Sequence, residues 1–286
     1  MLKAFRAYKI NGVLSSEASF NEYQYHPCTE QEVSRMGFVS VINALTHSLN
    51  GKTFFKIKKE KKQIPASTVA EKMKVLTDQF EAENGRKPSR KDKNELKEKV
   101  MIELGSRALS TYSTVEGWFD SDYVVVLTSS AGTAEDILSL LRKSLGSLPV
   151  SHGFDNHKLS DAMQKWFSGS DLPNNVSLGN EAKLSSCDEE KSSATIKNGE
   201  LNSEEIQALL NCRRVVSLEL CIADKGRFVV KDDGSIAKIS VSDVALEQHR
   251  ENVGDAEEDA ARLEGDLLLK ADIVDVILSS MNSVKS

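Results

Sequence analysis

Residues 84–100 read NGRKPSRKDKNELKEKV, and they join two segments in which apolar residues recur at helical spacing. The first stripe consists of Val69, Met73, Leu76 and Phe80, and the second of Leu96, Val100 and Leu104. Spacings of three and four place each set on one face of a helix. Pro65 is suited to open the first helix, and Gly85 and Gly105 are suited to end the two helices. The sequence therefore predicts a helical hairpin whose apolar stripes pack together.

The turn of this hairpin is rich in cations. Seven of the seventeen residues from 84 to 100 are Lys or Arg, and three are Asp or Glu. Ser89 and Asp92 stand in the order of a capping pair at the start of the second helix. If the apolar stripes face each other, the cations of the turn remain in water.

The charge of the chain is segregated. The formal net charge is -6, yet Lys52–Arg107 contains 16 Lys or Arg against 9 Asp or Glu, a local balance of +7. The rest therefore carries -13, and the stretch from 247 to 266 holds eight acidic residues and two arginines. Such separation builds a local field, which fits either two solvated helix faces or a surface that binds polyanions.

The remaining pattern predicts an α+β fold with antiparallel sheets, segregated helices and the protruding basic helical hairpin. We expect strands at 38–42 and 53–57, a β-hairpin over 113–119 and 122–128, and a C-terminal β-meander. Residues 58–62, KKEKK, suit a strand edge or an exposed turn. We expect further helices at 133–145, 160–167 and 201–211, and a final helix that starts at Asp272.

Four regions follow from this pattern. Residues 1–60 with 110–167 form a central α+β region, and residues 61–109 form the basic hairpin, or tip. Residues 168–200, rich in Ser, Asn and Gly, form a flexible connection. Residues 201–286 form a base that contains the meander and the last helices.

Motifs of the common enzyme classes are absent from the sequence. There is no GxxxxGK[ST], GxGxxG, GxSxG or HExxH. The nearest metal-like cluster is His152, Asp155 and His157, which lacks the further ligand that zinc requires. His26 and Cys28 flank a proline that restricts their geometry as a thiol–imidazole pair. We therefore predict a protein that is not an enzyme and needs no cofactor and no metal.

Composition also bears on location. No apolar run reaches the length of a membrane span, and the N-terminal residues lack the apolar core of a secretory signal. The four widely spaced cysteines suit reduced thiols. We expect a cytoplasmic protein without a membrane partner.

The basic hairpin is the best candidate for a functional surface. Lys and Arg that neutralise phosphates release counterions whatever the base sequence. A base-reading helix would need polar side chains at the base edges, and the second helix offers only Asn94. The charge pattern thus favours sequence-independent binding over a sequence-specific repressor.

A protein-interaction module is the alternative from a different class. In it the hairpin binds an acidic partner or the acidic segment of another copy. A nuclease would need clustered carboxylates and Mg²⁺.

The stretch LLRKSLGSLPV at 140–150, which follows AEDILS, is long and specific. Shorter or less specific stretches are RMGFVS, ALTHSLNG, KKEKKQIPAS, the hairpin turn itself, LNSEEI and KDDGSIAKI. Together, and in their order along the chain, these stretches resemble the recombination-associated protein RdgC family.

The resemblance implies a horseshoe-shaped subunit that forms a ring-shaped homodimer around double-stranded DNA. It also implies association with the nucleoid and modulation of recombination that depends on the RecA recombinase, through the DNA that both proteins share. The two contacts that close such a ring lie between the base regions and between the tips.

The candidate residues combine the charge pattern with this resemblance. The family's GRK at the hairpin turn is matched by Gly85, Arg86 and Lys87, and its basic residue before the tip by Arg107. Where the family reads P-R-A-F, this chain reads S-R-A-L, so Leu109 takes the aromatic position at the tip interface. The candidate DNA contacts are Lys58, Lys59, Lys61, Lys62, Arg86, Lys87, Arg90, Lys91, Arg107 and Lys197.

Overall fold

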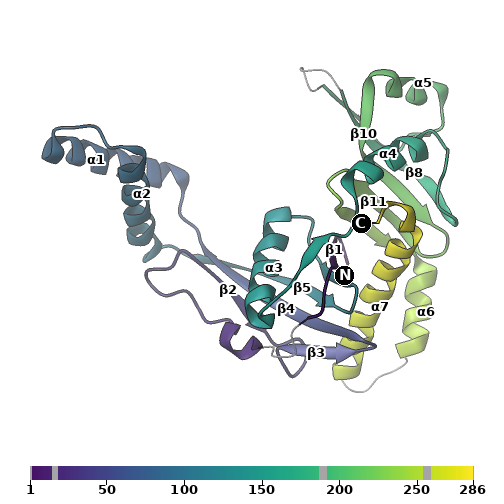
Figure 1. Cartoon of the computed structure of the whole chain (residues 1–286), viewed down its shortest axis with the longest axis horizontal. Coiled ribbons are helices and arrows are strands. Elements are labelled where there is room, and N and C mark those ends of the chain that lie inside the picture. The colour runs from purple at the N-terminus through teal and green to yellow at the C-terminus, as the bar shows by residue number, and fades with distance from the viewer. Residues whose placement is uncertain (1, 15–18, 187–191, 254–258, 286) are drawn as a thin grey trace.

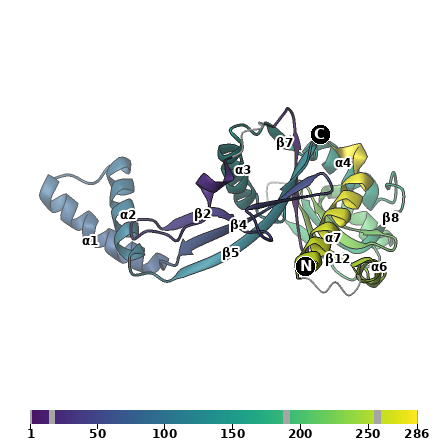
Figure 2. The same ribbon diagram turned by 90° about the horizontal axis from the view of Figure 1, so that it is seen from below.

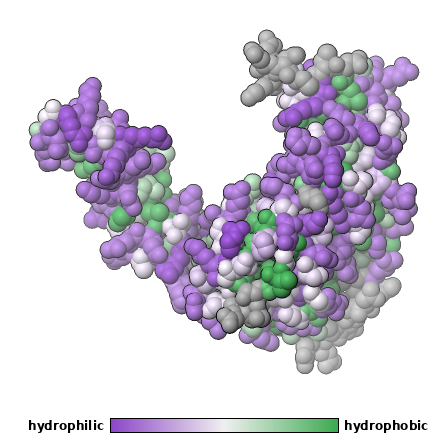
Figure 3. Space-filling model, viewed as in Figure 1, coloured by the Kyte–Doolittle hydropathy of each residue, from purple (hydrophilic) through white to green (hydrophobic). Residues whose placement is uncertain are grey.

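Two arms form a U in the computed structural model, which describes residues 2–14, 19–186, 192–253 and 259–285 (Figure 1). The space-filling view shows the same hollow between the arms (Figure 3). A helical hairpin forms the end of one arm, the more C-terminal of two sheets and its helices form the other, and the more N-terminal sheet lies at the base of the U. The described part of the chain is α+β with two antiparallel sheets, as the sequence predicts.

The sheet at the base of the U has the strand order β2-β4-β5-β6-β1-β7, with β3 paired to β4. Its strands are β1 (Arg6–Ile10), β2 (Ser34–Val39), β3 (Thr46–Leu49), β4 (Lys52–Lys62), β5 (Ser110–Phe119), β6 (Tyr123–Val126) and β7 (Val150–His152). The predicted strand at 53–57 and the predicted β-hairpin are confirmed, whereas the strand predicted at 38–42 ends earlier, at Val39. Residues 58–62 are neither an edge nor a turn, because β4 continues to Lys62 between β2 and β5.

Alternation along β4 sends its side chains to opposite faces of this sheet. Phe55 and Ile57 join the core cluster of helix α3 (Ala131–Leu145), and Figure 1 shows α3 on the floor of the U, between the arms. Phe54 instead packs with Trp118 in the core cluster that continues into the C-terminal half. Odd-numbered residues of β4 therefore face the same side as α3, and even-numbered residues face the other side.

The second sheet has the order β12-β11-β10-β8-β9. Its strands are β8 (Val176–Ser186), β9 (Ser193–Ile196), β10 (Arg213–Ile222), β11 (Gly226–Lys231) and β12 (Ile236–Val241). The predicted meander is confirmed as β10, β11 and β12. The flexible connection predicted over 168–200 is wrong for 176–186 and 193–196, which are strands. In β8 the buried positions are Gly179, Ala182 and Leu184, and two of these are too small to give a strong apolar signal in the sequence.

The remaining helices are α1 (Ala66–Asn84), α2 (Arg90–Gly105), α4 (Asn156–Phe167), α5 (Glu204–Gln207), α6 (Asp243–Val253) and α7 (Asp259–Ser280), with short 3-10 turns at Phe20–Tyr23, Ala208–Cys212 and Asn282–Val284. The predicted hairpin is confirmed as α1 and α2. The final helix starts at Asp259 rather than Asp272, because residues 259–271 belong to the same continuous helix. No described helix combines the length and the apolar character of a membrane span.

Candidate nucleic-acid interface

The hairpin turn is held by its own side chains. Gly85 adopts a left-handed conformation with φ 62°, and Ser89 and Asp92 form the predicted capping box. The carboxylate of Asp92 accepts hydrogen bonds from the Ser89 amide at 2.8 Å and from the Arg86 guanidinium at 2.7 Å. The Arg86 bond, followed by the bonds from Ser89, lowers the pKa of Asp92, and the same ion pair raises the pKa of Arg86. Arg86 also lies over the ring of Phe80, 5.0 Å from its centroid.

The cations beside Arg86 are less constrained. Lys87 and Arg90 are exposed, and within the described residues neither forms an ion pair. Lys91 approaches Glu95 at 4.0 Å, but 86% of its side chain stays exposed. These three residues can therefore contact a polyanion without first losing a partner of comparable strength.

The structure implies different roles for Arg86 and Lys87. If these cations bind duplex DNA, replacing Lys87 with Ala should weaken that binding about fivefold, the equivalent of about 1 kcal/mol for one solvent-exposed ion pair. Arg86→Ala should also lower the thermal stability of the hairpin, because Asp92 and Phe80 lose their partner. Fluorescence anisotropy and circular dichroism of both variants distinguish these effects; equal melting temperatures would contradict the structural role of Arg86.

Alternation separates the four candidate lysines of β4. Lys59 and Lys61 lie on the face of α3, where Lys59 donates to Asp136 at 2.7 Å and Lys61 is exposed. Lys58 lies on the opposite face, with its ammonium 4.6 and 4.7 Å from the ring centroids of Tyr25 and Tyr112. The four residues thus do not form one patch.

Lys62 is buried, which the sequence does not reveal. Only 9% of it is exposed, and its ammonium donates to the backbone carbonyls of Thr29 at 2.7 Å and Glu30 at 3.3 Å. Because this cation already stabilises the loop before β2, we remove it from the candidate phosphate contacts.

A buried carboxylate also interrupts the lysines of β4. Glu60 accepts hydrogen bonds from the hydroxyls of Tyr25 and Ser110, each at 2.6 Å, and from the Cys28 amide at 2.9 Å. These bonds, that of Ser110 first, lower the pKa of Glu60 to about 2. The Glu60 hub, which we define as Glu60 with Tyr25, Cys28 and Ser110, joins β4 to the first residue of β5 and to the loop before β2.

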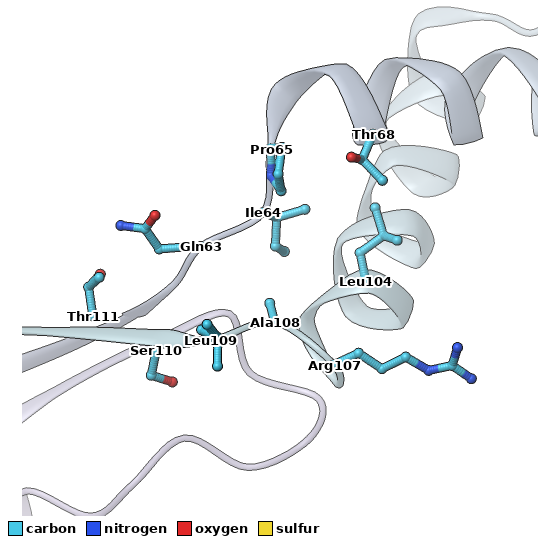
Figure 4. A pocket seen from close by; sticks show the side chains of 10 residues that line it. All are labelled: Gln63, Ile64, Pro65, Thr68, Leu104, Arg107, Ala108, Leu109, Ser110 and Thr111. Atoms are coloured by element: carbon cyan, nitrogen blue, oxygen red, sulfur yellow. The ribbon is translucent and has the colours of Figure 1, made fainter.

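Arg107 and Leu109, the candidate residues at the tip, line a pocket where the helical hairpin meets strands β4 and β5 (Figure 4). The pocket has a volume of about 570 Å³, and its lining includes Ile64, Leu104, Arg107 and Leu109. Leu109 is 84% exposed, although it is a large apolar residue. Arg107 is exposed at the end of α2 and extends away from the strands (Figure 4).

Lys197 is exposed after β9, on the arm formed by the second sheet. The structure therefore does not bring it together with the hairpin residues. The labelled strands of that arm, β8 and β10, stand on the opposite side of the hollow of the U from α1 and α2 (Figure 1).

Two of the residues considered for metal binding or catalysis, Asp155 and Cys28, form structural contacts. Asp155 is the N-cap of α4 and accepts from the amides of His157 and Lys158. Burial, and then the nearby Glu60, raise the pKa of the Cys28 thiol, which disfavours a thiolate nucleophile. Among the described residues, no three His, Cys, Asp or Glu side chains are grouped so that they could hold a metal ion.

Part of the acidic segment at 247–266 lies outside the residues whose side chains are described, namely Glu251, Asp255, Glu257 and Glu258. Of the others, Glu264 on α7 bonds the His47 ring of β3 at 2.8 Å. At least one carboxylate of the acidic segment therefore links helix α7 to strand β3, in the sheet at the base of the U.

Comparison with known proteins agrees with the sequence resemblance. A family model described as "Putative exonuclease, RdgC" matches residues 2–284. The chain belongs to the RdgC family. A protein of Psychromonas ingrahamii named "Recombination-associated protein RdgC" is 32% identical over 260 residues, which cover 88% of this chain and 85% of that protein.

Two further RdgC proteins with the same printed name show similar agreement. That of Yersinia enterocolitica is 31% identical over 260 residues, 88% of this chain and 85% of the relative. That of Pseudoalteromonas translucida is 31% identical over 265 residues, 90% of this chain and 86% of the relative. Membership of the family connects the chain with recombination by name.

Proposed function

We propose that this RdgC-family chain binds double-stranded DNA without reading its sequence, as a ring-shaped homodimer whose hollow surrounds the duplex. The observation that carries the proposal is the set of exposed cations on the hairpin arm, of which Lys87 and Arg90 have no ion-pair partner among the described residues. Neutralising phosphates with such cations gives binding that ignores base identity.

The surface we propose is smaller than the sequence suggests. It comprises Lys59 and Lys61 on the α3 face of β4, the hairpin residues Arg86, Lys87, Arg90 and Lys91, Arg107 at the tip, and Lys197 on the opposite arm. Lys58 faces the other side of the sheet, and Lys62 is buried. Two arms that carry cations around one hollow suit a duplex better than a flat patch would.

Through this binding the protein would occupy DNA that the RecA recombinase also needs. It would thereby modulate recombination as a cytoplasmic protein associated with the nucleoid.

The word exonuclease in the family description suggests DNA cleavage as the alternative function. The grouping of carboxylates that Mg²⁺-dependent cleavage requires is not found within the described residues. Incubation with linear and supercoiled plasmid in Mg²⁺ should leave both intact, and shortening of the linear form would favour the exonuclease.

The decisive test of a ring compares circular with linear DNA. Protein loaded on a nicked circle should remain bound through a high-salt wash, whereas protein on a linear fragment of the same sequence should be lost from the free ends. The control is a linear fragment with both ends blocked by streptavidin, which should retain the protein as the circle does. Equal retention on open linear and circular DNA would exclude encirclement.

The exposed Leu109 supports a tip contact between copies. Leu109→Asp should weaken the dimer by about 3 kcal/mol, or more than 100-fold, because a two-fold contact loses the burial of about 1.5 kcal/mol or more from each subunit. Leu109→Phe should strengthen it. Sedimentation over a concentration series measures both, with Val13→Asp as a control at another exposed apolar residue. An unchanged dissociation constant for Leu109→Asp would place the contact elsewhere.

A further inference from the structure

Strand β5 has an edge without a backbone partner. It pairs with β4 along its whole length, from Ser110 to Phe119, but β6 pairs with it only from Gly117 to Phe119. Figure 2 shows β5 along the border of the strands that run toward the hairpin. The part of β5 between the hairpin and β6 is therefore an outer edge of the sheet.

The direction of the free backbone groups follows from two hydrogen bonds. The Leu109 carbonyl faces β4, where it accepts from the Gln63 amide at 2.8 Å, and the Glu116 carbonyl faces the β6 side, where it accepts from Leu127 at 2.9 Å. Because successive residues of a strand point in opposite directions, the N–H and C=O of Tyr112 and Thr114 also face the β6 side. Within the described chain, no backbone group hydrogen-bonds to these four.

This edge lacks the features that usually prevent pairing. Its register with β4 is continuous from Ser110 to Phe119, so there is no bulge, and residues 110–115 include no proline and no charged side chain. Residues 111–114 are all exposed. Proteins normally protect such edges with charges, prolines, bulges or covering segments, so an unprotected one indicates a surface that is used.

A groove with cationic side chains continues the edge. It has a volume of about 470 Å³ and is lined by Lys3, Thr114, Glu116, Thr128 and Lys270, among others. Glu116 binds Lys270 at 2.6 Å and Lys56 at 3.5 Å. Lys3 is exposed, and its ammonium forms no ion pair within the described part of the chain. Three lysines around one carboxylate give this end of the edge a positive balance.

We propose that the free edge of β5 binds an extended, acidic peptide segment of a partner protein by strand addition. Tyr112 and Thr114 each present one donor and one acceptor, and another peptide backbone satisfies both at once. Phosphates would satisfy only the amides and would be repelled by the carbonyls, so DNA fits this edge poorly. An acidic side chain of the added strand would meet Lys3 at the groove, and another would meet Lys58 beside Tyr112.

The test uses a labelled, end-blocked octapeptide of alternating glutamate and valine, with alternating lysine and valine as the control peptide. Thr114→Pro removes the outward amide without touching the bonds to β4, which the odd-numbered residues make. Thr114→Ala is its matched control, because it shortens the same side chain and keeps the amide. The full-length wild-type chain should bind the glutamate peptide and not the lysine peptide, and Thr114→Pro should bind about tenfold more weakly than Thr114→Ala.

Hydrogen exchange on the wild-type chain makes the test independent of the proline variant. Bound glutamate peptide should slow exchange at the amides of Tyr112 and Thr114, while affinity for DNA should be the same in Thr114→Pro and Thr114→Ala. Protection confined to the hairpin amides would overturn the proposal, since the peptide would then be acting as a polyanion. Equal peptide affinity of the two variants would also overturn it. Neither result would bear on DNA binding, which uses the other surface.

Discussion

Replacing Lys87, Arg90 and Lys91 together with Ala should weaken binding to mixed-sequence duplex DNA by about 100-fold at low salt. Each residue contributes one solvent-exposed ion pair with phosphate of about 1 kcal/mol net, and about 3 kcal/mol corresponds to a factor of about 100. The exposed state of all three residues means that none must break a buried contact before it binds. The loss should be the same for every DNA sequence tested.

Salt dependence separates this mechanism from loss of folding. The slope of log K against log salt should be about -5 for the wild-type chain if five to six phosphates are neutralised, and it should become shallower by about three for the triple variant. A misfolded protein would lose affinity without such a defined change of slope. A wild-type affinity that does not respond to salt would contradict the electrostatic mechanism altogether.

The matched control removes the same amount of charge elsewhere. Lys225, Arg227 and Lys238 are exposed in the second sheet and its turns. Their joint replacement with Ala should change the affinity less than threefold. If it weakens binding as much as the hairpin variant does, net charge rather than the hairpin surface controls the association. A larger loss on one operator than on random DNA would indicate a base-reading repressor.

The hairpin and its turn could be predicted from the sequence because their signals are local. The apolar stripes, Gly85 and the pair Ser89 and Asp92 lie within a few residues of the structures that they determine, and the capping box forms as expected. Helix α3 was predictable for the same reason, although it begins at Ala131, two residues before the predicted start. Local signals of this kind do not depend on which segments meet in the folded chain.

Non-local contacts account for what the sequence did not reveal. The buried state of Lys62 depends on carbonyls 32 and 33 residues away in the chain, and strand β8 is buried by pairing with β10. The opposite directions of Lys58 and Lys59 could have been read from strand alternation. The charges of the KKEKK stretch instead favour a strand edge or an exposed turn, and so conceal the continuation of β4 as an inner strand.

The Glu60 hub should be the most sensitive polar site for stability. Replacing Glu60 with Gln keeps the shape but places an amide where three donors converge, so we expect a loss of about 2–3 kcal/mol, the range for hydrogen bonds to a charged acceptor. Glu60 is 4% exposed, so water cannot replace the lost bonds. Urea unfolding measures the change, with Glu98→Gln, on the exposed side of α2, as a control that should stay within about 0.5 kcal/mol.

The stability difference between the wild-type chain and Glu60→Gln should depend on pH. Hydrogen bonds from Ser110, Tyr25 and Cys28 hold the pKa of Glu60 at about 2, below its ordinary value of 4.5. A carboxylate with a lowered pKa stabilises the fold above the ordinary pKa, and that contribution is lost as the pH falls through the folded value. The difference between wild type and Glu60→Gln should therefore be complete above about pH 5 and shrink steadily toward pH 2.

The Glu60 hub should also affect assembly of the dimer, because it lies next to the tip residue Leu109. Ser110 follows Leu109 directly, and the Gln63 amide bonds the Leu109 carbonyl, so the hub fixes the strand that presents the tip side chain. Glu60→Gln should then weaken the dimer under conditions where the subunit is still folded, and Ser110→Ala, which removes one hub bond, should do so to a smaller extent. A constant difference in stability from pH 7 to pH 2, together with an unchanged dimer, would show that Glu60 does not act as a charged acceptor at this joint.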